Sequence, residues 1–213
     1  VELGVDGVEL DIRLTKDQKP VIVHDADLRR IAGDNRYVED LTLAELKRVP
    51  LRHGSSIPTM DEVTGCVPDP CIIDFEVKDA RVLDQVIRKL NTSKGLRSRA
   101  LISSFQPTVI EEAKRLLPEV PRLCLLKRWP VRTWRFSEWL SMQDVWGVAQ
   151  IYTALNEPRI RWLKSLEIRV GTWEPFGLRS SQRRARRLAR MGIDLAIVNQ
   201  PQCYQRAGEH ELE

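Results

Sequence analysis

The stretch GVELDIRLT, residues 7–15, has the residue pattern of a β-strand, and the prediction of the fold begins there. Apolar and charged side chains alternate along it, so the apolar residues point to one face of a β-strand while Glu9 and Asp11 point to the other. A turn over residues 16–19 leads into PVIVHD, residues 20–25, which completes a predicted hairpin. One face of this strand is therefore suited to a core, and the opposite face carries two carboxylates.

Outward from this hairpin, strand-like and helical segments alternate. The strand-like runs cover residues 71–78, 99–105, 120–126, 146–152, 166–174 and 193–201. Helical spacing of apolar residues marks 80–90, 107–117, 156–166 and 180–192, and two capping boxes are formed by Thr42 with Glu45 and Thr59 with Glu62. The aromatic segment 127–140 is predicted to be a loop and helix inserted between two units.

This alternation predicts a parallel sheet, which either a doubly wound fold or an eight-stranded barrel satisfies. No glycine-rich phosphate loop follows any of the strands, which disfavours the nucleotide-binding doubly wound fold. The favoured fold class is therefore α/β, a (β/α)8 TIM-type barrel.

The N-terminus predicts an incomplete barrel. VELG, residues 1–4, resembles the last turn of a helix with Gly4 at its left-handed cap. With the hairpin strand set aside, seven parallel strands remain, one fewer than a closed barrel needs. We expect residues 1–213 to form a single barrel domain without its first strand and most of its first helix. Backbone amides of strands 7–15 and 193–201 would then lie unpaired at the edges.

Composition excludes several other classes of protein. The 213 residues are 42% hydrophobic and 30% charged, as expected of a globular fold, and no apolar run is long enough to form an integral membrane segment. The net charge of +4 divides into −7 before residue 80 and +11 after it. The arginine-rich run 180–192 has an apolar helix face and no interleaved aromatic residues, so nucleic acid is not an expected partner.

The cysteine pattern gives no sign of a zinc site and favours a reducing compartment. Four cysteines show neither zinc-ligand spacing nor clustered histidines. Reduced thiols are the expected state, which suits a cytoplasmic protein. Nothing in the pattern specifies an oligomeric state.

Carboxylates provide the first candidate site. The predicted strand CIIDFEVK, residues 71–78, places Asp74, Glu76 and Lys78 on one face. In the same way, the strand 7–15 places Glu9 and Asp11 on one of its faces. Charged residues at the carboxyl ends of parallel barrel strands are typical of active sites, and clustered carboxylate oxygens favour Mg²⁺ or Ca²⁺. The competing interpretation is that Glu9 and Asp11 face solvent or pair with a cationic side chain, Arg13 or Lys78.

His24, at the end of the hairpin, is a candidate for proton transfer near neutral pH. A structural role is the competing interpretation, because an unperturbed pKa alone does not distinguish a catalytic histidine from any other.

The stretch GVDGVELDIRLTKDQKPVIVHDADLRRIAG, residues 4–33, resembles the signature of the glycerophosphodiester phosphodiesterase family. The resemblance continues through DLTLAELK and IPTMDEV to later segments that are similar to further strands of that family's barrel. These later segments are DFEVK (74–78), SSFQP (103–107) and GIDLAIVNQP (192–201).

The resemblance implies a set of roles. Glu9, Asp11 and Glu76 would hold a divalent cation, Mg²⁺ or Ca²⁺, Lys78 would contact the phosphate, and His24 would be one of two proton-transfer histidines. The implied reaction is metal-dependent hydrolysis of a small-molecule glycerophosphodiester to glycerol phosphate and an alcohol, in glycerophospholipid metabolism.

The chain departs from the family at three points. The His-Arg-Gly strand that supplies the second histidine is absent from the 213 residues. GTWEPFG, residues 171–177, differs from the usual end of the penultimate strand, although Trp173 is expected to wall the substrate site. Asn199 stands where an aspartate is common. A catalytically inactive barrel that binds a phosphorylated ligand or a protein partner is therefore the alternative function.

Overall fold

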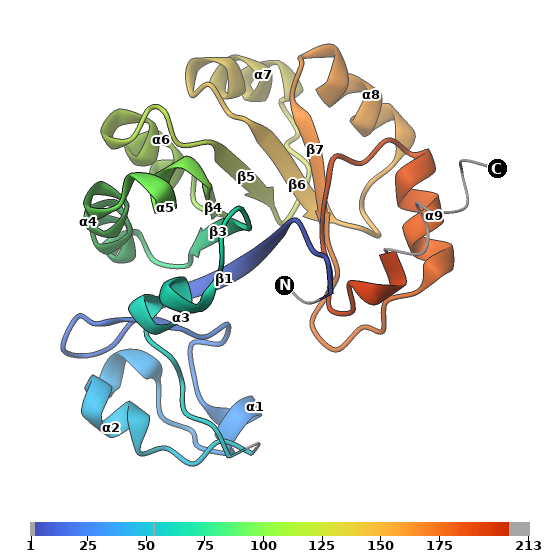
Figure 1. Cartoon of the computed structure of the whole chain (residues 1–213). Helices are drawn as coiled ribbons and strands as arrows, with labels where there is room; N and C mark the ends of the chain where they lie inside the picture. Colours follow the sequence, from blue (N-terminus) through green and yellow to red (C-terminus); the bar gives the residue numbers. More distant parts are fainter. Residues whose placement is uncertain (1–2, 53, 205–213) are drawn as a thin grey trace.

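The computed structural model describes residues 3–52 and 54–204, and its centre is a curled sheet (Figure 1). Eight strands in the described residues follow the order β2-β1-β3-β4-β5-β6-β7-β8. Neighbouring strands are parallel throughout, except that β2 pairs antiparallel with β1. Their bounds are β1 Gly7–Leu14, β2 Pro20–Ile22, β3 Ile72–Val77, β4 Ala100–Ser104, β5 Arg122–Leu126, β6 Gly147–Ile151, β7 Arg169–Trp173 and β8 Leu195–Ile197.

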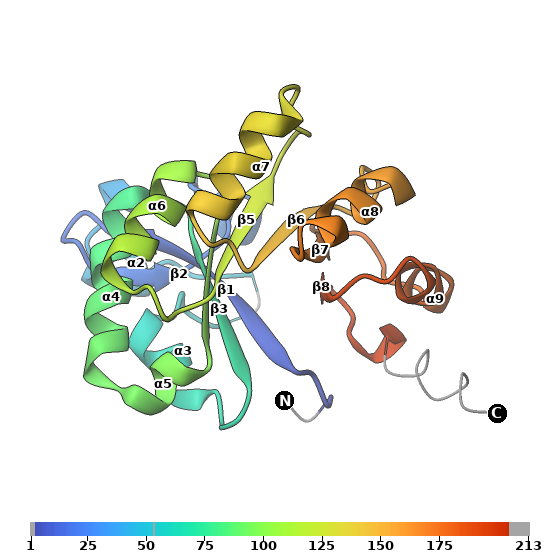
Figure 2. The same ribbon diagram turned by 90° about the horizontal axis from the view of Figure 1, so that it is seen from above.

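Helices connect the parallel strands and cover the outer, convex side of the sheet (Figure 2). The longer helices are α4 Leu83–Thr92, α6 Pro107–Leu116, α7 Thr133–Met142, α8 Glu157–Ser165 and α9 Gln182–Arg190. The shorter ones are α1 Arg29–Ala32, α2 Leu43–Lys47, α3 Met60–Cys66, α5 Lys94–Ser98 and the 3₁₀ turns Val38–Asp40 and Ala80–Val82. Within the described residues no helix has the length and apolar character needed to cross a bilayer.

The predicted capping boxes are confirmed at α2 and α3. Thr42 accepts a hydrogen bond from the Glu45 amide, Thr59 accepts one from the Glu62 amide, and each glutamate accepts one from the amide of its threonine. Both helices are short and begin where these side chains satisfy the first free amides.

The aromatic segment 127–140 forms the expected loop and helix, but it is not an insertion, and that part of the expectation was wrong. It forms the connection from β5 to β6, with α7 in the ordinary place of a barrel helix. Leu140 is buried there, and Phe136 packs against Trp162 of α8 with ring centroids 6.2 Å apart. The aromatic residues therefore fill the space between two barrel helices, which their spacing alone did not indicate.

Apolar side chains occupy both sides of the sheet. The larger clusters lie between strands and helices, and a smaller cluster lies on the concave side, where Leu123 and Ala149 are completely buried. Gly171 of β7 faces this concave cluster, and a Cβ there would lie 2.8 Å from the Ala149 Cβ. Close strand packing therefore requires glycine at this position.

The region between β1 and β3 carries a small core of its own. Residues 20–57 bury Leu28, Val38 and Leu46 together with other apolar side chains, below the sheet in Figure 1. This region holds His24 beside β1, because the amide of Val23 donates to the Asp11 carbonyl at 2.9 Å.

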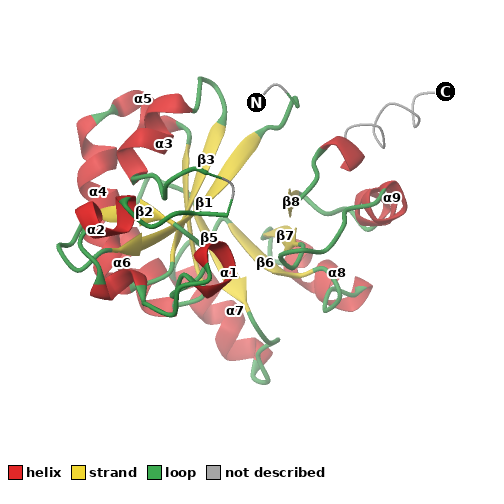
Figure 3. Ribbon diagram, turned by 90° about the horizontal axis from the view of Figure 1, so that it is seen from below, coloured by secondary structure: helices red, strands yellow, loops and turns green. Residues whose placement is uncertain are grey.

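The two edges of the sheet differ from the expectation. In the described residues β8 pairs only with β7, whereas the carboxyl-terminal half of β1 pairs with β2 from Ile12 to Leu14. In the described residues the predicted unpaired edge therefore holds for β8 and for the amino-terminal half of β1 but not for residues 12–14, and β1 and β8 are not hydrogen-bonded to each other (Figure 3). Gly4 has a left-handed φ of 63°, while Val1, Glu2 and the tail beyond Tyr204 lie outside the described residues.

Candidate active site

Three carboxylates meet on the concave side of β1 and β3. The register pairs Glu9 with Asp74 and Asp11 with Glu76, so all four side chains share one face of the sheet. Glu9, Asp11 and Glu76 each offer an oxygen within 4.8 Å of the others. The structure thus brings together the three residues that the sequence singled out.

Lys78 follows β3 and lies directly against this acidic group. Its Nζ is 2.7 Å from Asp11 Oδ1 and 2.5 Å from Glu76 Oε1. Burial lowers the pKa of Lys78, but Asp11 and Glu76 outweigh burial, so the net shift of its pKa is upward. The competing interpretation from sequence was that Lys78 pairs with these acids. Asp11 does pair with Lys78, whereas Glu9 makes no such contact in the described residues.

Burial disfavours the ionised form of these acids. It raises the pKa of Glu9 to about 9, with Asp11 the next contributor. It raises the pKa of Asp74 to about 7 and also raises that of Glu76. Glu9 Oε1 and both Asp74 carboxylate oxygens are buried without a hydrogen-bond partner in the described residues. An oxygen-only donor set with unsatisfied oxygens fits a hard divalent cation.

His24 lies beside this group with its side chain about half exposed, at 52%. Its Nδ1 is 2.7 Å from Asp25 Oδ1, and Arg30 Nε is 2.5 Å from the other oxygen of Asp25. Burial raises the pKa of Asp25, but hydrogen bonds from Arg30 and His24 outweigh it and leave the pKa below its usual value. An ionised Asp25 fixes the ring through Nδ1, so Nε2 is the nitrogen available for proton transfer.

Arg13 binds the histidine segment and not the acids. Its Nε and one terminal nitrogen donate to the His24 carbonyl oxygen at 3.1 and 2.9 Å. The sequence-based pairing of Arg13 with Glu9 or Asp11 is therefore wrong. Arg13 instead connects the strand that carries two acids to the segment that carries the histidine.

Trp173 reaches the same end of the barrel from β7. Its ring contacts Phe105 edge-on, with centroids 5.4 Å apart, and the Phe105 centroid lies 5.9 Å from Lys78 Nζ and 5.4 Å from Lys127 Nζ. The expected position of Trp173 beside the site agrees with this arrangement. Sequence analysis missed Phe105 and Lys127, although each directly follows or ends a predicted strand.

The two unusual positions Glu174 and Asn199 belong to one network. The Glu174 side chain has no exposed surface and accepts hydrogen bonds from Ser180, Arg184 and Tyr204. The Asn199 amide also donates to Glu174, at 3.2 Å, and its side chain donates to two carbonyls of the loop 175–178. Glu174 and Asn199 thus hold the loop that follows β7 in place.

That loop also contacts the histidine region. Arg30, which binds Asp25, places its guanidinium 3.7 Å from the Phe176 ring centroid. The contact joins residues about 150 positions apart in sequence across the mouth of the barrel.

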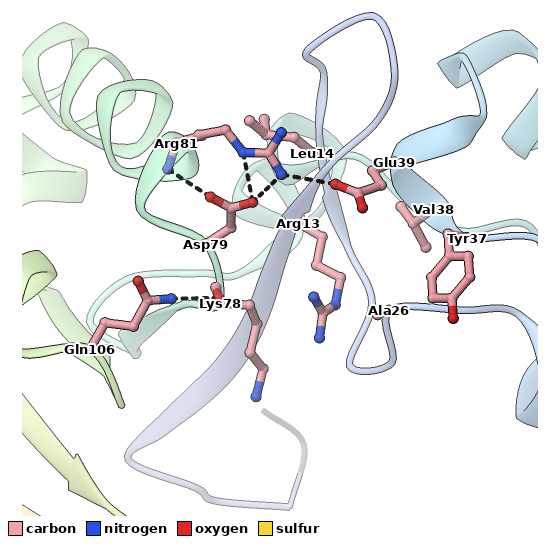
Figure 4. Close-up of a pocket in the computed structure, with 10 residues that line it drawn as sticks. All are labelled: Arg13, Leu14, Ala26, Tyr37, Val38, Glu39, Lys78, Asp79, Arg81 and Gln106. Carbon is pink, nitrogen blue, oxygen red and sulfur yellow. Dashed lines mark hydrogen bonds and ion pairs between the residues drawn. The ribbon is translucent and has the colours of Figure 1, made fainter.

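A cavity of about 330 Å³ opens beside Lys78, between the strand ends and the β1–β3 region (Figure 4). In Figure 4 the side chains of Arg13 and Lys78 extend in the same direction, whereas Arg81 is held by Asp79 and Glu39. Of the candidate site residues, Lys78 lines this cavity, whereas Glu9, Asp11, Glu76, His24 and Trp173 are not among its lining residues.

The fold and the site define an α/β-barrel enzyme whose charged groups meet at the carboxyl ends of its strands. A sequence model of the Glycerophosphoryl diester phosphodiesterase family matches residues 1–203. The chain belongs to this family and is a phosphoric diester hydrolase, which confirms the resemblance and the enzyme class inferred from sequence.

Related proteins agree along nearly the whole chain. The glycerophosphodiester phosphodiesterase of Caldanaerobacter subterraneus subsp. tengcongensis is 25% identical over 214 residues, 95% of this chain and 85% of that protein. The crystal structure of the Thermotoga maritima glycerophosphodiester phosphodiesterase matches with a TM-score of 0.80 and 26% identity, covering 98% and 87% of the two chains. An Oleispira antarctica phosphodiesterase, solved with the product sn-glycerol-3-phosphate, has a TM-score of 0.81 and 24% identity, covering 98% and 87%. These structures confirm the TIM-type fold.

Proposed function

We propose that the protein hydrolyses glycerophosphodiesters in a divalent-cation-dependent reaction, with Glu9, Asp11 and Glu76 as the cation ligands. The convergence of these three carboxylates within 4.8 Å is the observation that carries the proposal. Mg²⁺ or Ca²⁺ bound there supplies positive charge that offsets the phosphate and lowers the pKa of a hydroxyl or water.

The side chains around the acids have separate roles. The ammonium of Lys78 adds positive charge for a phosphate oxygen, and its contacts with Asp11 and Glu76 hold it at the site. As an oxygen of water or of a substrate hydroxyl forms a bond to phosphorus, the bond from phosphorus to the alcohol oxygen breaks, and His24 donates a proton from Nε2 to that departing oxygen. Asp25 keeps the ring in position, and Trp173 with Phe105 forms the apolar wall opposite the charged side.

The product class follows from the family and from one neighbour. The family name specifies glycerophosphodiesters, and the Oleispira protein is complexed with sn-glycerol-3-phosphate. We therefore propose glycerol phosphate and an alcohol as products, with a role in glycerophospholipid breakdown. The four free cysteines support a reducing, cytoplasmic setting for this activity.

The direct test is release of glycerol phosphate from glycerophosphocholine by the full-length protein, with Mg²⁺, with Ca²⁺ and with chelator. We expect activity with a cation and none with chelator. Glu76→Ala should fall below about 1% of wild type, because even residues that only support metal ligands contribute 10- to 100-fold. The control Glu138→Ala, at an exposed glutamate of α7, should keep full activity.

Full activity of Glu76→Ala would contradict the ligand assignment. A folded wild-type protein that binds the cation but releases no product from any glycerophosphodiester would instead support the inactive, ligand-binding barrel.

A further inference from the structure

The connection from β5 to α7 presents an unusual exposed surface. This connection together with the first three residues of α7, 127–135 (KRWPVRTWR), contains four cationic side chains and no acidic one. We define this segment as the rim segment, because it follows β5 at the carboxyl ends of the strands, the same end of the barrel as Lys78 and Trp173. Figure 2 shows it, in yellow, projecting beyond the neighbouring connections.

Apolar side chains at the tip of the rim segment face solvent. Val131 is 98% exposed and Trp134 is 58% exposed. All six tryptophans lie in the described residues, and Trp134 is the exposed one. The Arg135 guanidinium lies over its ring, 5.0 Å from the centroid.

The exposure follows from how the segment is anchored. Trp129 packs against Phe136 and Trp162, with ring centroids 6.4 and 5.5 Å away, and Arg159 stacks on its ring at 5.0 Å. This contact fixes one side of the rim segment to α7 and α8. Val131 and Trp134 are left on the outer side, where no described residue buries them.

Two of the four cationic side chains, Arg128 and Arg132, have no charged or hydrogen-bonding partner among the described residues. Both are exposed, and their guanidinium groups make no ion pair or hydrogen bond with any residue in 3–52 or 54–204. The arginines of α9 offer a contrast, because that helix has many exposed cations but no large apolar side chain exposed among them.

We propose that the rim segment docks the protein on an anionic lipid surface. Clustered Lys and Arg side chains attract anionic headgroups, tryptophan rings favour the interface between headgroups and acyl chains, and an exposed valine gains from leaving water. Nucleic acid would use the cations but would leave Val131 in water. The inference concerns where the protein binds, and it is independent of the reaction at the strand ends.

Docking through this segment would also orient the barrel. Lys127, at its start, lies 5.4 Å from the Phe105 ring, which contacts Trp173. A surface that touches the tip would therefore face the open ends of the strands, where a lipid-derived diester would enter.

Co-sedimentation with vesicles tests the proposal. The full-length protein is mixed with vesicles of phosphatidylcholine alone or with about 30% phosphatidylglycerol, at about 0.1 M salt. We expect binding to the anionic vesicles and little to the neutral ones. Absence of binding to the anionic vesicles would overturn the proposal.

Two double variants separate charge from apolar insertion. R128E with R132E should weaken binding roughly 30-fold or more, since each basic side chain near the surface contributes roughly fivefold. V131S with W134S should weaken it several-fold while leaving net charge unchanged. Wild-type binding by the second variant would overturn the proposal, because the contact would then be purely electrostatic.

The matched control changes the same charge elsewhere. R183E with R186E alters two exposed arginines of α9 and should bind as wild type. Equal losses in the control and in the R128E with R132E variant would show that net charge alone governs binding and would overturn the proposal. Circular dichroism confirms that each variant is folded, and glycerophosphocholine hydrolysis in solution should stay at the wild-type rate in all of them.

Discussion

Asp74 is a buried acid beside the three proposed cation ligands. It lies on the concave face beside Glu9 and Glu76, is 6% exposed, and both of its oxygens lack a hydrogen-bond partner in the described residues. Burial raises its pKa to about 7. Ionisation of a buried carboxyl without a partner costs free energy, so this residue should weaken the folded state when no cation is bound.

Replacing Asp74 by asparagine should therefore stabilise the metal-free protein, and more at high pH. The unfolded carboxyl ionises near its usual pKa of about 3.9, so between that pH and about 7 the folded state binds more protons. Wild-type stability falls as pH rises through this window. The gain from Asp74→Asn in chelator should be about 1–3 kcal/mol larger at pH 8 than at pH 5, measured by urea unfolding.

The control for this prediction is Asp84→Asn, at an exposed position of α4. Its effect should be the same at both pH values. A gain from Asp74→Asn that does not change with pH would mean that the carboxyl ionises normally in the folded protein.

His24 depends on Asp25 for its orientation, which gives a second prediction at this scale. Asp25→Asn should lower kcat about tenfold or more with little change in KM, whereas His24→Ala should lower it by roughly 10²- to 10⁴-fold. Asp25→Asn should add little to the His24→Ala variant, because both changes remove one function. Additive losses in the double variant would argue against a positioning role. Asp40→Asn, at an exposed position, is the control.

At the scale of elements, local pattern was sufficient for the strands and for the presence of a helix at α7, but not for the place of that helix in the barrel. Alternation and capping residues are local signals, and they predicted β1, β3 and the starts of α2 and α3. The helix α7 depends on Trp129 and Phe136 meeting Trp162, a partner about 30 residues away. The same limit applies to the Arg30 contact with Phe176, since no local spacing signals it.

Close packing of β6 and β7 is testable at one glycine. Gly171→Ala places a Cβ 2.8 Å from the Ala149 Cβ, too close for two strands held by backbone hydrogen bonds. We expect a loss of about 1–3 kcal/mol in the free energy of unfolding. Gly95→Ala in α5 is the control, because a Cβ there meets nothing within 4 Å, and it should be neutral or stabilising by up to about 1 kcal/mol. Equal effects of the two changes would contradict tight packing at β7.

At the scale of the molecule, the concave side of the sheet divides into a charged half and an apolar half. Glu9, Asp11 and Glu76 lie over β1 and β3, whereas Leu123 and Ala149 fill the side formed by β5 and β6. Sequence analysis predicted the charged half because period-two strands that lie parallel must bring their acids together. It did not predict the network of Glu174, Ser180 and Tyr204, whose members converge only once β7, α9 and the following segment are folded.

Because burial disfavours ionisation of these acids, a divalent cation bound among them should stabilise the whole fold. A divalent cation that binds the folded chain and not the unfolded chain stabilises it by about 2.7 kcal/mol at one hundred times its Kd. We expect Mg²⁺ or Ca²⁺ to raise Tm and chelator to reverse the change, measured by differential scanning calorimetry. Glu76→Ala should abolish the cation-induced rise, and Glu138→Ala should retain it. A full rise in Glu76→Ala would place the stabilising cation elsewhere, because a site that loses one of its three close carboxylates cannot hold the ion with unchanged affinity.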